Sequence, residues 1–188
     1  MTTTIVSPAA FNILFTSYKL CPAFDVTRSR NSLNKMKVEQ SVIINLPPED
    51  IFAYMSNLEY LPDWSSAVIF ARKISSEEML IGTTVRCTIR ILGRWLDTTF
   101  EIVECVPNRY LTFKSITGIA PSLICYRFEP VEGGGTNVSL EEIIYFLGGF
   151  LGFAEPVVIS VIRRQIAHDL LTLKDLLEAA ASIRSSAG

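Results

Sequence analysis

The stretch that decides the fold is PVVISVIRRQIAHDLLTLKDLLEAAA, residues 156–181, near the end of the chain. Its apolar residues recur in steps of four and three, which places them on one face of a helix. They are Val158, Ile162, Ile166, Leu170, Leu173 and Leu177. Pro156 suits a first helical turn, and at about 1.5 Å per residue the helix runs roughly 39 Å. One side of this helix must be buried against another element.

That element must be a β-sheet, because the chain has no second helix of comparable length and most of what precedes it alternates with the two-residue period of strands. We expect strands at residues 38–45, 68–74, 84–91, 96–102, 110–117, 124–128 and 138–146, and short helices at 48–57 and 58–64. Hairpins in immediate succession make an antiparallel meander. The predicted fold is α+β: a curved seven-stranded antiparallel sheet around the long C-terminal helix, with two short helices between the first two strands.

The composition excludes several classes of function. Of the 188 residues 49% are hydrophobic, and a net charge of −2 argues against a nucleic-acid surface, which needs clustered Lys and Arg. One histidine and four scattered cysteines give no zinc pattern, and Gly133-Gly134-Gly135 joins two strands as a hairpin turn rather than a phosphate loop. We therefore expect no metal and no cofactor. No apolar run is long enough to span a bilayer, and free cysteines favour a reducing, cytoplasmic location.

Residues 1–35 differ from the rest of the chain. They are rich in Thr and Ser, and Asp25 is their only acid. We predict a poorly ordered extension, or a start assigned too early with Met36 as the true initiator. The composition also fits an organelle-targeting segment. The expected organisation is an extension at 1–35, a folded domain at 36–182 and a tail at 183–188.

Several short motifs occur in a fixed order between Met36 and Ala180, a span of about three-quarters of the chain. They are Ile44-x-Leu46-Pro47-x-Glu49-x-Ile51-Phe52, Leu61-Pro62-x-Trp64, Gly82-Thr83, Pro107-Asn108-Arg109-Tyr110-Leu111, Phe128-Glu129-Pro130 with Gly135-Thr136-x-Val138, and Leu173-Lys174-x-Leu176-Leu177-Glu178. The ordered set resembles the polyketide cyclase/dehydrase and START-like (SRPBCC) superfamily, whose fold is called the helix-grip. That superfamily includes lipid carriers, hormone receptors and aromatase/cyclases, so the resemblance indicates the fold more sharply than the function.

The resemblance implies a cavity between the inner face of the sheet and the long helix. It also implies a hydrophobic or amphipathic small molecule as the partner. Combined with the strand and helix periodicities, it makes the following residues candidates for ligand binding: Trp64, Phe70, Val85, Cys87, Ile89, Leu96, Phe100, Phe113, Tyr126, Leu140, Glu142, Ile162 and Ile166.

Glu142 is the most informative acid. Period-two counting places it on the apolar face of its strand with Leu140 and Ile144, where a carboxylate must find a partner or stay protonated. In a cavity it would act as a general acid/base or orient a polar ligand group, with Tyr126 as the orienting group. Two alternatives stay open: a bulge that turns Glu142 outward, or an ion pair with an arginine that the sequence does not name.

Two further features bear on function. His168 is expected to face solvent rather than to take part in catalysis. The segment 146–153 combines apolar side chains with three glycines. Three interpretations stay open: an apolar lip over the cavity mouth, a loop folded over the core, or a peripheral contact with a membrane or partner. The side chains that would make such a contact are Phe146, Phe150, Leu151 and Phe153.

Three hypotheses follow, in this order. The first is a binding module for a hydrophobic or amphipathic small molecule, because the chain offers much apolar wall and few catalytic groups. The second is a cyclase or dehydratase that acts on an aromatic or polyketide-like substrate through Glu142 and Tyr126. The third is a membrane- or protein-interaction module.

Overall fold

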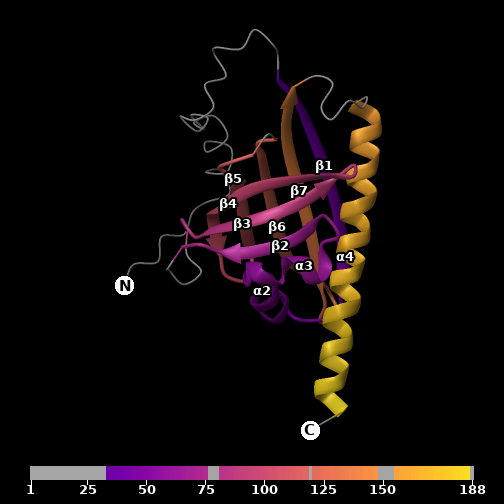
Figure 1. Ribbon diagram of the computed structural model, residues 1–188. Coiled ribbons are helices and arrows are strands. Elements are labelled where there is room, and N and C mark those ends of the chain that lie inside the picture. The colour runs from indigo at the N-terminus through magenta and orange to yellow at the C-terminus, as the bar shows by residue number, and fades with distance from the viewer. Residues whose placement is uncertain (1–32, 76–80, 119, 148–154, 187–188) are drawn as a thin grey trace, which may run out of the picture. The chain divides into compact units, whose positions relative to one another are not determined.

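The strands form one antiparallel sheet in the order β1-β7-β6-β5-β4-β3-β2 (Figure 1). The computed structural model describes residues 33–75, 81–118, 120–147 and 155–186. Its elements are β1 (Leu33–Ile44), α2 (Pro48–Ser56), η2 (Leu58–Tyr60), α3 (Leu61–Trp64), β2 (Val68–Lys73), β3 (Thr84–Ile91), β4 (Arg94–Val106), β5 (Tyr110–Ser115), β6 (Ser122–Pro130), β7 (Thr136–Leu147) and α4 (Glu155–Ser186). Strands β2 to β7 form the meander, and β1 pairs with β7. The predicted seven-stranded α+β fold is confirmed.

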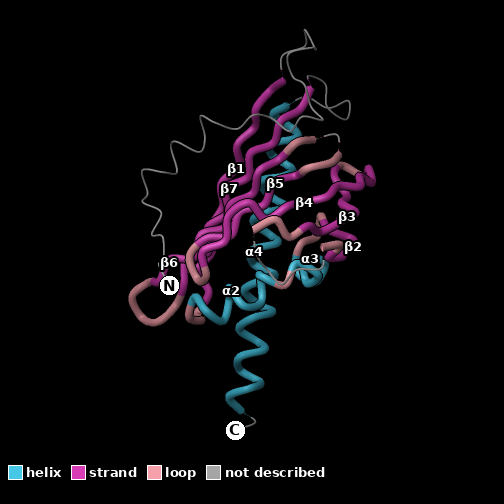
Figure 2. The backbone as a smooth tube through the Cα atoms, turned by 90° about the vertical axis from the view of Figure 1, so that its left-hand side faces the viewer, coloured by secondary structure: helices cyan, strands magenta, loops and turns pink. Residues whose placement is uncertain are grey.

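The helix α4 is held to the sheet by the apolar stripe that the sequence predicts. Val158, Ile162, Ile166, Leu170, Leu173 and Leu177 are all buried and belong to one core cluster with residues of the sheet and of α2 and α3. Burying one such side chain contributes about 1.5–3 kcal/mol relative to leaving it exposed, so the stripe is the main attachment of the helix. Figures 1 and 2 show α4 lying along the sheet from two perpendicular directions.

A polar clamp at the end of β1 adds to this apolar contact. The Lys174 ammonium donates to the backbone carbonyl of Ile43 at 2.6 Å, and the backbone N–H of Asn45 donates to the Glu178 carboxylate at 2.7 Å. The two side chains stand one turn apart on α4 and form an ion pair at 3.0 Å. Two backbone groups at the end of β1, one on either side of the last β1–β7 pair, therefore find partners on the helix, which fixes its position along the strand.

The short helices connect β1 to β2, the two edge strands of the sheet. Glu49 and Asp50 lie in the first turn of α2, where the helix dipole favours acids, and Phe52 packs edge-on against Phe128 of β6 with ring centroids 5.6 Å apart. The buried side chains of α2 are Ile51, Phe52 and Met55, as predicted. Helix α3 ends at Trp64, which is buried in the core cluster.

The hairpin between β6 and β7 uses its glycines as predicted. Gly133 and Gly134 have φ values of +96° and +91°, which residues with a side chain rarely adopt. Gly135 has a different role, because a Cβ at that position would lie 2.9 Å from the carbonyl oxygen of Ile44. The turn therefore allows a close approach between β7 and the end of β1, next to the polar clamp on α4.

Candidate functional site

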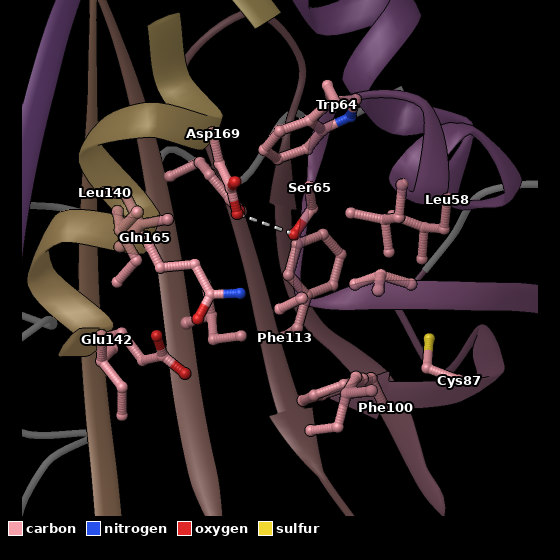
Figure 3. Close-up of a pocket in the computed structure, with 18 of the residues that line it drawn as sticks. Leu58, Trp64, Ser65, Cys87, Phe100, Phe113, Leu140, Glu142, Gln165 and Asp169 are labelled. Atoms are coloured by element: carbon pink, nitrogen blue, oxygen red, sulfur yellow. Dashed lines mark hydrogen bonds between the residues drawn. The ribbon is translucent and has the colours of Figure 1, made fainter. Parts of the chain in front are cut away.

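A cavity of about 110 Å³ lies between the inner face of the sheet and α4, beside the α3 corner (Figure 3). Its wall consists mainly of aliphatic and aromatic side chains from β3 to β7 and α4. The side chains with oxygen or nitrogen atoms in the wall are Trp64, Ser65, Tyr126, Glu142, Gln165 and Asp169. Small-molecule sites in proteins have this form, an apolar enclosure with a few convergent polar groups.

The structure places all but two of the predicted ligand-binding residues in this wall. Those that line the cavity are Trp64, Val85, Cys87, Ile89, Phe100, Phe113, Tyr126, Leu140, Glu142, Ile162 and Ile166. They come from the end of α3, from five strands and from α4, so the fold brings together residues as distant in the chain as Trp64 and Ile166. Phe70 and Leu96 are the two that it leaves out.

Phe70 does not line the cavity, because β2 contains a bulge. The register with β3 shifts between Val68 and Phe70, so Val68 lines the cavity whereas Phe70 is turned to the outer face and is 50% exposed. Ala71 takes the inward position opposite Cys87. One extra residue in a strand reverses the side-chain alternation beyond it. A strictly alternating pattern cannot reveal this.

Leu96 is the second predicted residue that lies outside the cavity wall. Leu96 stands opposite Ile89 and so projects from the inner face of the sheet, but it is not part of the cavity wall. Strand β4 contributes Phe100 instead. Alternation assigns a side chain to a face, but the cavity occupies only part of that face.

Glu142 projects from β7 into the cavity, as its place on the apolar face predicts. Its strand neighbours are Val38 on β1 and Ile124 on β6, and Figure 3 shows its carboxylate turned into the enclosed space. Arg127 lies instead 3.8 Å from Glu141 on the outer face. In the described part of the chain no hydrogen bond or ion pair reaches the Glu142 carboxylate. Burial therefore raises the pKa of this carboxyl to about 7.

Tyr126 lies one diagonal step from Glu142 on the neighbouring strand, because it pairs with Leu140. Its ring is buried and meets the rings of Trp64 and Phe113 edge-on, with centroids 6.1 and 5.9 Å apart. Burial, together with the nearby charges of Glu142 and Asp169, raises the pKa of the Tyr126 phenol well above its ordinary value. The phenol is therefore protonated at neutral pH and can donate a hydrogen bond.

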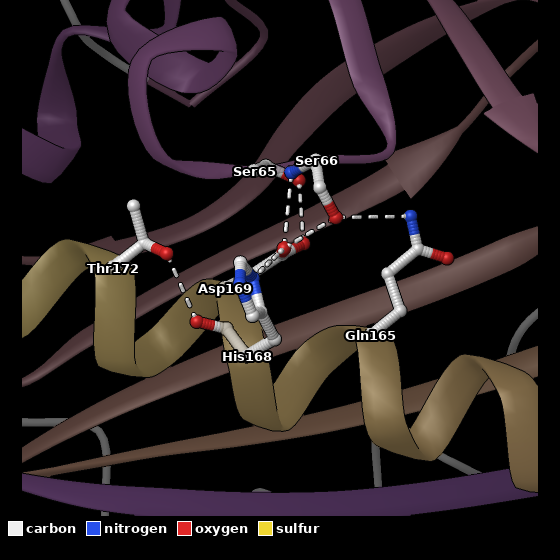
Figure 4. A network of polar contacts seen from close by, with 6 residues as sticks. All are labelled: Ser65, Ser66, Gln165, His168, Asp169 and Thr172. Atoms are coloured by element: carbon white, nitrogen blue, oxygen red, sulfur yellow. Dashed lines mark hydrogen bonds and ion pairs between the residues drawn. The ribbon is translucent and has the colours of Figure 1, made fainter.

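Asp169 is the buried polar residue of the site that the sequence analysis missed, together with its neighbours Ser65 and Gln165 in the wall. It is buried on α4 and accepts three hydrogen bonds: from Ser65 Oγ at 3.1 Å, from Ser66 N at 3.0 Å and from Ser66 Oγ at 2.6 Å (Figure 4). Gln165 Nε2 donates to Ser66 Oγ at 3.3 Å. These bonds fasten the helix to the α3–β2 corner at the edge of the cavity. A signal was available, since Asp169 follows Ile166 by three residues and so shares the apolar face.

The single histidine faces solvent, as predicted. The side chain of His168 is 73% exposed, and its Nδ1 lies 3.8 Å from Asp169 on the outer rim of the site. Among residues 33–75, 81–118, 120–147 and 155–186 no group of three His, Cys, Asp or Glu side chains could hold a metal ion.

The structure describes only part of the segment 146–153, for which the sequence suggested a membrane contact. Phe146 belongs to β7, whereas Phe150, Leu151 and Phe153 lie outside the described residues. Within the described helices, none is long and apolar enough to cross a bilayer.

Comparison with known proteins identifies the family of this chain and several structures with the same fold. Residues 35–178 match the family model described as polyketide cyclase/dehydrase and lipid transport. A comparison with curated proteins found no match.

Solved structures with the same fold include a protein from Thermus thermophilus, 24% identical over 77% of this chain and 99% of that chain with a TM-score of 0.65. The Zhui aromatase/cyclase from a Streptomyces species is 15% identical over 77% and 94% of the two chains, also with a TM-score of 0.65. A START superfamily protein from Mycobacterium smegmatis is 14% identical over 77% and 98%, again with a TM-score of 0.65. At these identities the likeness shows a shared fold.

Proposed function

The chain belongs to the polyketide cyclase/dehydrase and lipid transport family, and on that premise we propose that it binds a hydrophobic or amphipathic small molecule in the cavity between the sheet and α4. The observation that carries the proposal is the cavity itself. Its volume is about 110 Å³ and its wall is mainly apolar, with few polar side chains. For scale, a protein cavity of ~150 Å³ lined by apolar side chains holds a benzene ring, so this cavity is somewhat smaller than a benzene-sized site and suits a compact guest.

The comparisons support the proposal at the level of the family. The family description joins polyketide chemistry with lipid transport, and both involve largely apolar molecules. The neighbouring structures include one described as an aromatase/cyclase and one described as a START superfamily protein. A binding function needs only what this cavity offers: apolar enclosure and a few groups that orient the guest.

The test compares two phenylalanine substitutions on adjacent residues of α4. Ile162→Phe adds a ring to a side chain that lines the cavity, whereas Val161→Phe adds the same ring on the outer side of the helix. Binding of an apolar fluorescent probe, and recovery of co-purified small molecules by native mass spectrometry, should persist in wild type and in Val161→Phe. Both should fall in Ile162→Phe. If wild type binds no probe and carries no ligand, or if the two variants bind equally, the proposal is wrong.

A second function, catalysis, is favoured by one observation. A general acid/base works best when its pKa lies near the working pH, and burial raises the pKa of Glu142 to about 7. Tyr126, one diagonal step away, would donate a hydrogen bond to a substrate carbonyl. Turnover of aromatic polyketide-like substrates should then be lost in Glu142→Gln and retained in Glu141→Gln, whose side chain lies on the outer face. Equal turnover in both variants would eliminate this role.

A further inference from the structure

The charges around the cavity have one sign. Its wall contains the carboxylates of Glu142 and Asp169, and no Lys, Arg or His side chain in the described part of the chain lines it. Once Glu142 is ionised, an anionic guest would therefore meet two like charges in a largely apolar space where water screens them weakly. The apolar remainder of the wall offers no compensation for a charged carboxylate head group.

The two carboxylates are in different states of hydrogen bonding. Asp169 already accepts three hydrogen bonds from Ser65 and Ser66, so it acts as a structural group. Glu142 receives none from the described residues, and Figure 3 shows it turned into the enclosed space. A carboxylate has room for about four accepted hydrogen bonds. Glu142 is therefore the acceptor in the wall that a guest can satisfy.

A second acceptor lies close by on the helix. The amide nitrogen of Gln165 donates to Ser66 Oγ, which leaves its carbonyl oxygen available on the cavity side. Figure 3 shows Gln165 between Asp169 and Glu142. The polar edge of the cavity is therefore rich in acceptors, and the Tyr126 phenol is the main donor.

We propose that the cavity selects a compact apolar molecule that carries a hydrogen-bond donor, a hydroxyl or a protonated amine, with Glu142 as its acceptor, and that it rejects molecules whose polar end is a carboxylate. The inference rests on the proposed binding function and specifies its ligand class. A buried acceptor gains most from a guest that supplies the missing donor, because the alternative is to leave the acceptor without a partner. A site built in this way discriminates more strongly than apolar walls can.

The test uses four molecules with one ring in common: toluene, benzyl alcohol, benzylamine and benzoate. Dissociation constants are measured by NMR titration at pH values above the pKa of Glu142. We expect benzyl alcohol and benzylamine to bind about tenfold more tightly than toluene, because a hydrogen bond to a charged group strengthens binding by at least about that factor. Benzoate should bind most weakly. The wild-type series decides the question by itself, whatever any substitution does to folding.

Two variants assign the preference to one side chain. In Glu142→Gln the advantage of benzylamine over toluene should vanish and benzoate should bind more tightly than it does to wild type. In Glu141→Gln, one residue away on the outer face, the order should match wild type. If all four molecules bind equally, or if benzoate binds best, the ligand class is wrong while the binding function stands. If none of them binds and apolar probes also fail, both proposals fall.

Discussion

Replacing Glu142 by glutamine should stabilise the protein above neutral pH. Burial raises the pKa of this carboxyl from its ordinary value of 4.5 to about 7, so the folded protein holds a proton there that the unfolded chain releases at about pH 4.5. Between these two values stability falls as pH rises, at about 1.4 kcal/mol per pH unit. Above pH 7 the ionised carboxylate should lower the free energy of unfolding by about 3 kcal/mol.

Glutamine has nearly the same shape and cannot ionise, so this pH dependence should disappear in the variant. Urea unfolding, followed by the fluorescence of the buried Trp64, gives the free energy of unfolding of both proteins at about pH 5 and about pH 8. The two should be similar at the lower pH, and the variant should be more stable by about 3 kcal/mol at the higher one. The difference between the proteins isolates Glu142, because all other titrating groups are common to both.

Glu141→Gln is the matched control. Glu141 lies on the outer face with Lys37 and Arg127, at 3.3 and 3.8 Å, and partly exposed ion pairs contribute about 0–1 kcal/mol. Its loss removes these ion pairs and should lower stability slightly at both pH values. The reasoning about Glu142 is refuted if wild type and Glu142→Gln differ by the same amount at both pH values. It is refuted equally if the control shows the larger pH dependence.

Three other substitutions or reactions test the packing around the site. Asp169→Ala leaves three donors without their acceptor and should lower the free energy of unfolding by about 2–3 kcal/mol. The same change at the exposed Asp175 should alter it by less than about 0.5 kcal/mol, and equal effects in urea unfolding would contradict a structural role for the Asp169 hydrogen bonds. Gly135→Ala should cost about 1–3 kcal/mol, because its Cβ would meet the carbonyl oxygen of Ile44, and an unchanged melting temperature would argue against that contact. Burial raises the pKa of the Cys87 thiol to about 12, so at about pH 8 iodoacetamide should modify it about a thousandfold more slowly in the folded protein than in the unfolded chain; peptide mass spectrometry that finds equally fast modification would show that the thiol is accessible.

The elements with a strong periodic pattern could be predicted from the sequence. The stripe on α4 is regular over six apolar positions, and every one of them is buried. On β7, the two-residue period of a strand predicts that Glu142 lies on the inner face, and the structure places it there. In both cases the pattern specifies a face, and burial of that face follows from the hydrophobic effect.

The features that the sequence analysis did not predict depend on three-dimensional geometry that no local sequence pattern contains. The bulge in β2 inserts one residue between Val68 and Phe70, and nothing in the alternation announces it. Asp169 was within reach of helical counting, but its partners Ser65 and Ser66 are about a hundred residues away and become neighbours only in the folded chain. Whether Glu142 has a counter-ion is likewise decided by which strands meet around it.

The measurement that tests the central claim most directly is an isoleucine-methyl NMR spectrum recorded with and without toluene. Ile89, Ile124 and Ile162 line the cavity, whereas Ile43 and Ile183 are exposed elsewhere. The account predicts saturable shifts at the first three methyl groups and unchanged signals from the last two. Shifts confined to the exposed methyl groups, or no shifts at saturating toluene, would show that the space between the sheet and α4 does not accept an apolar guest.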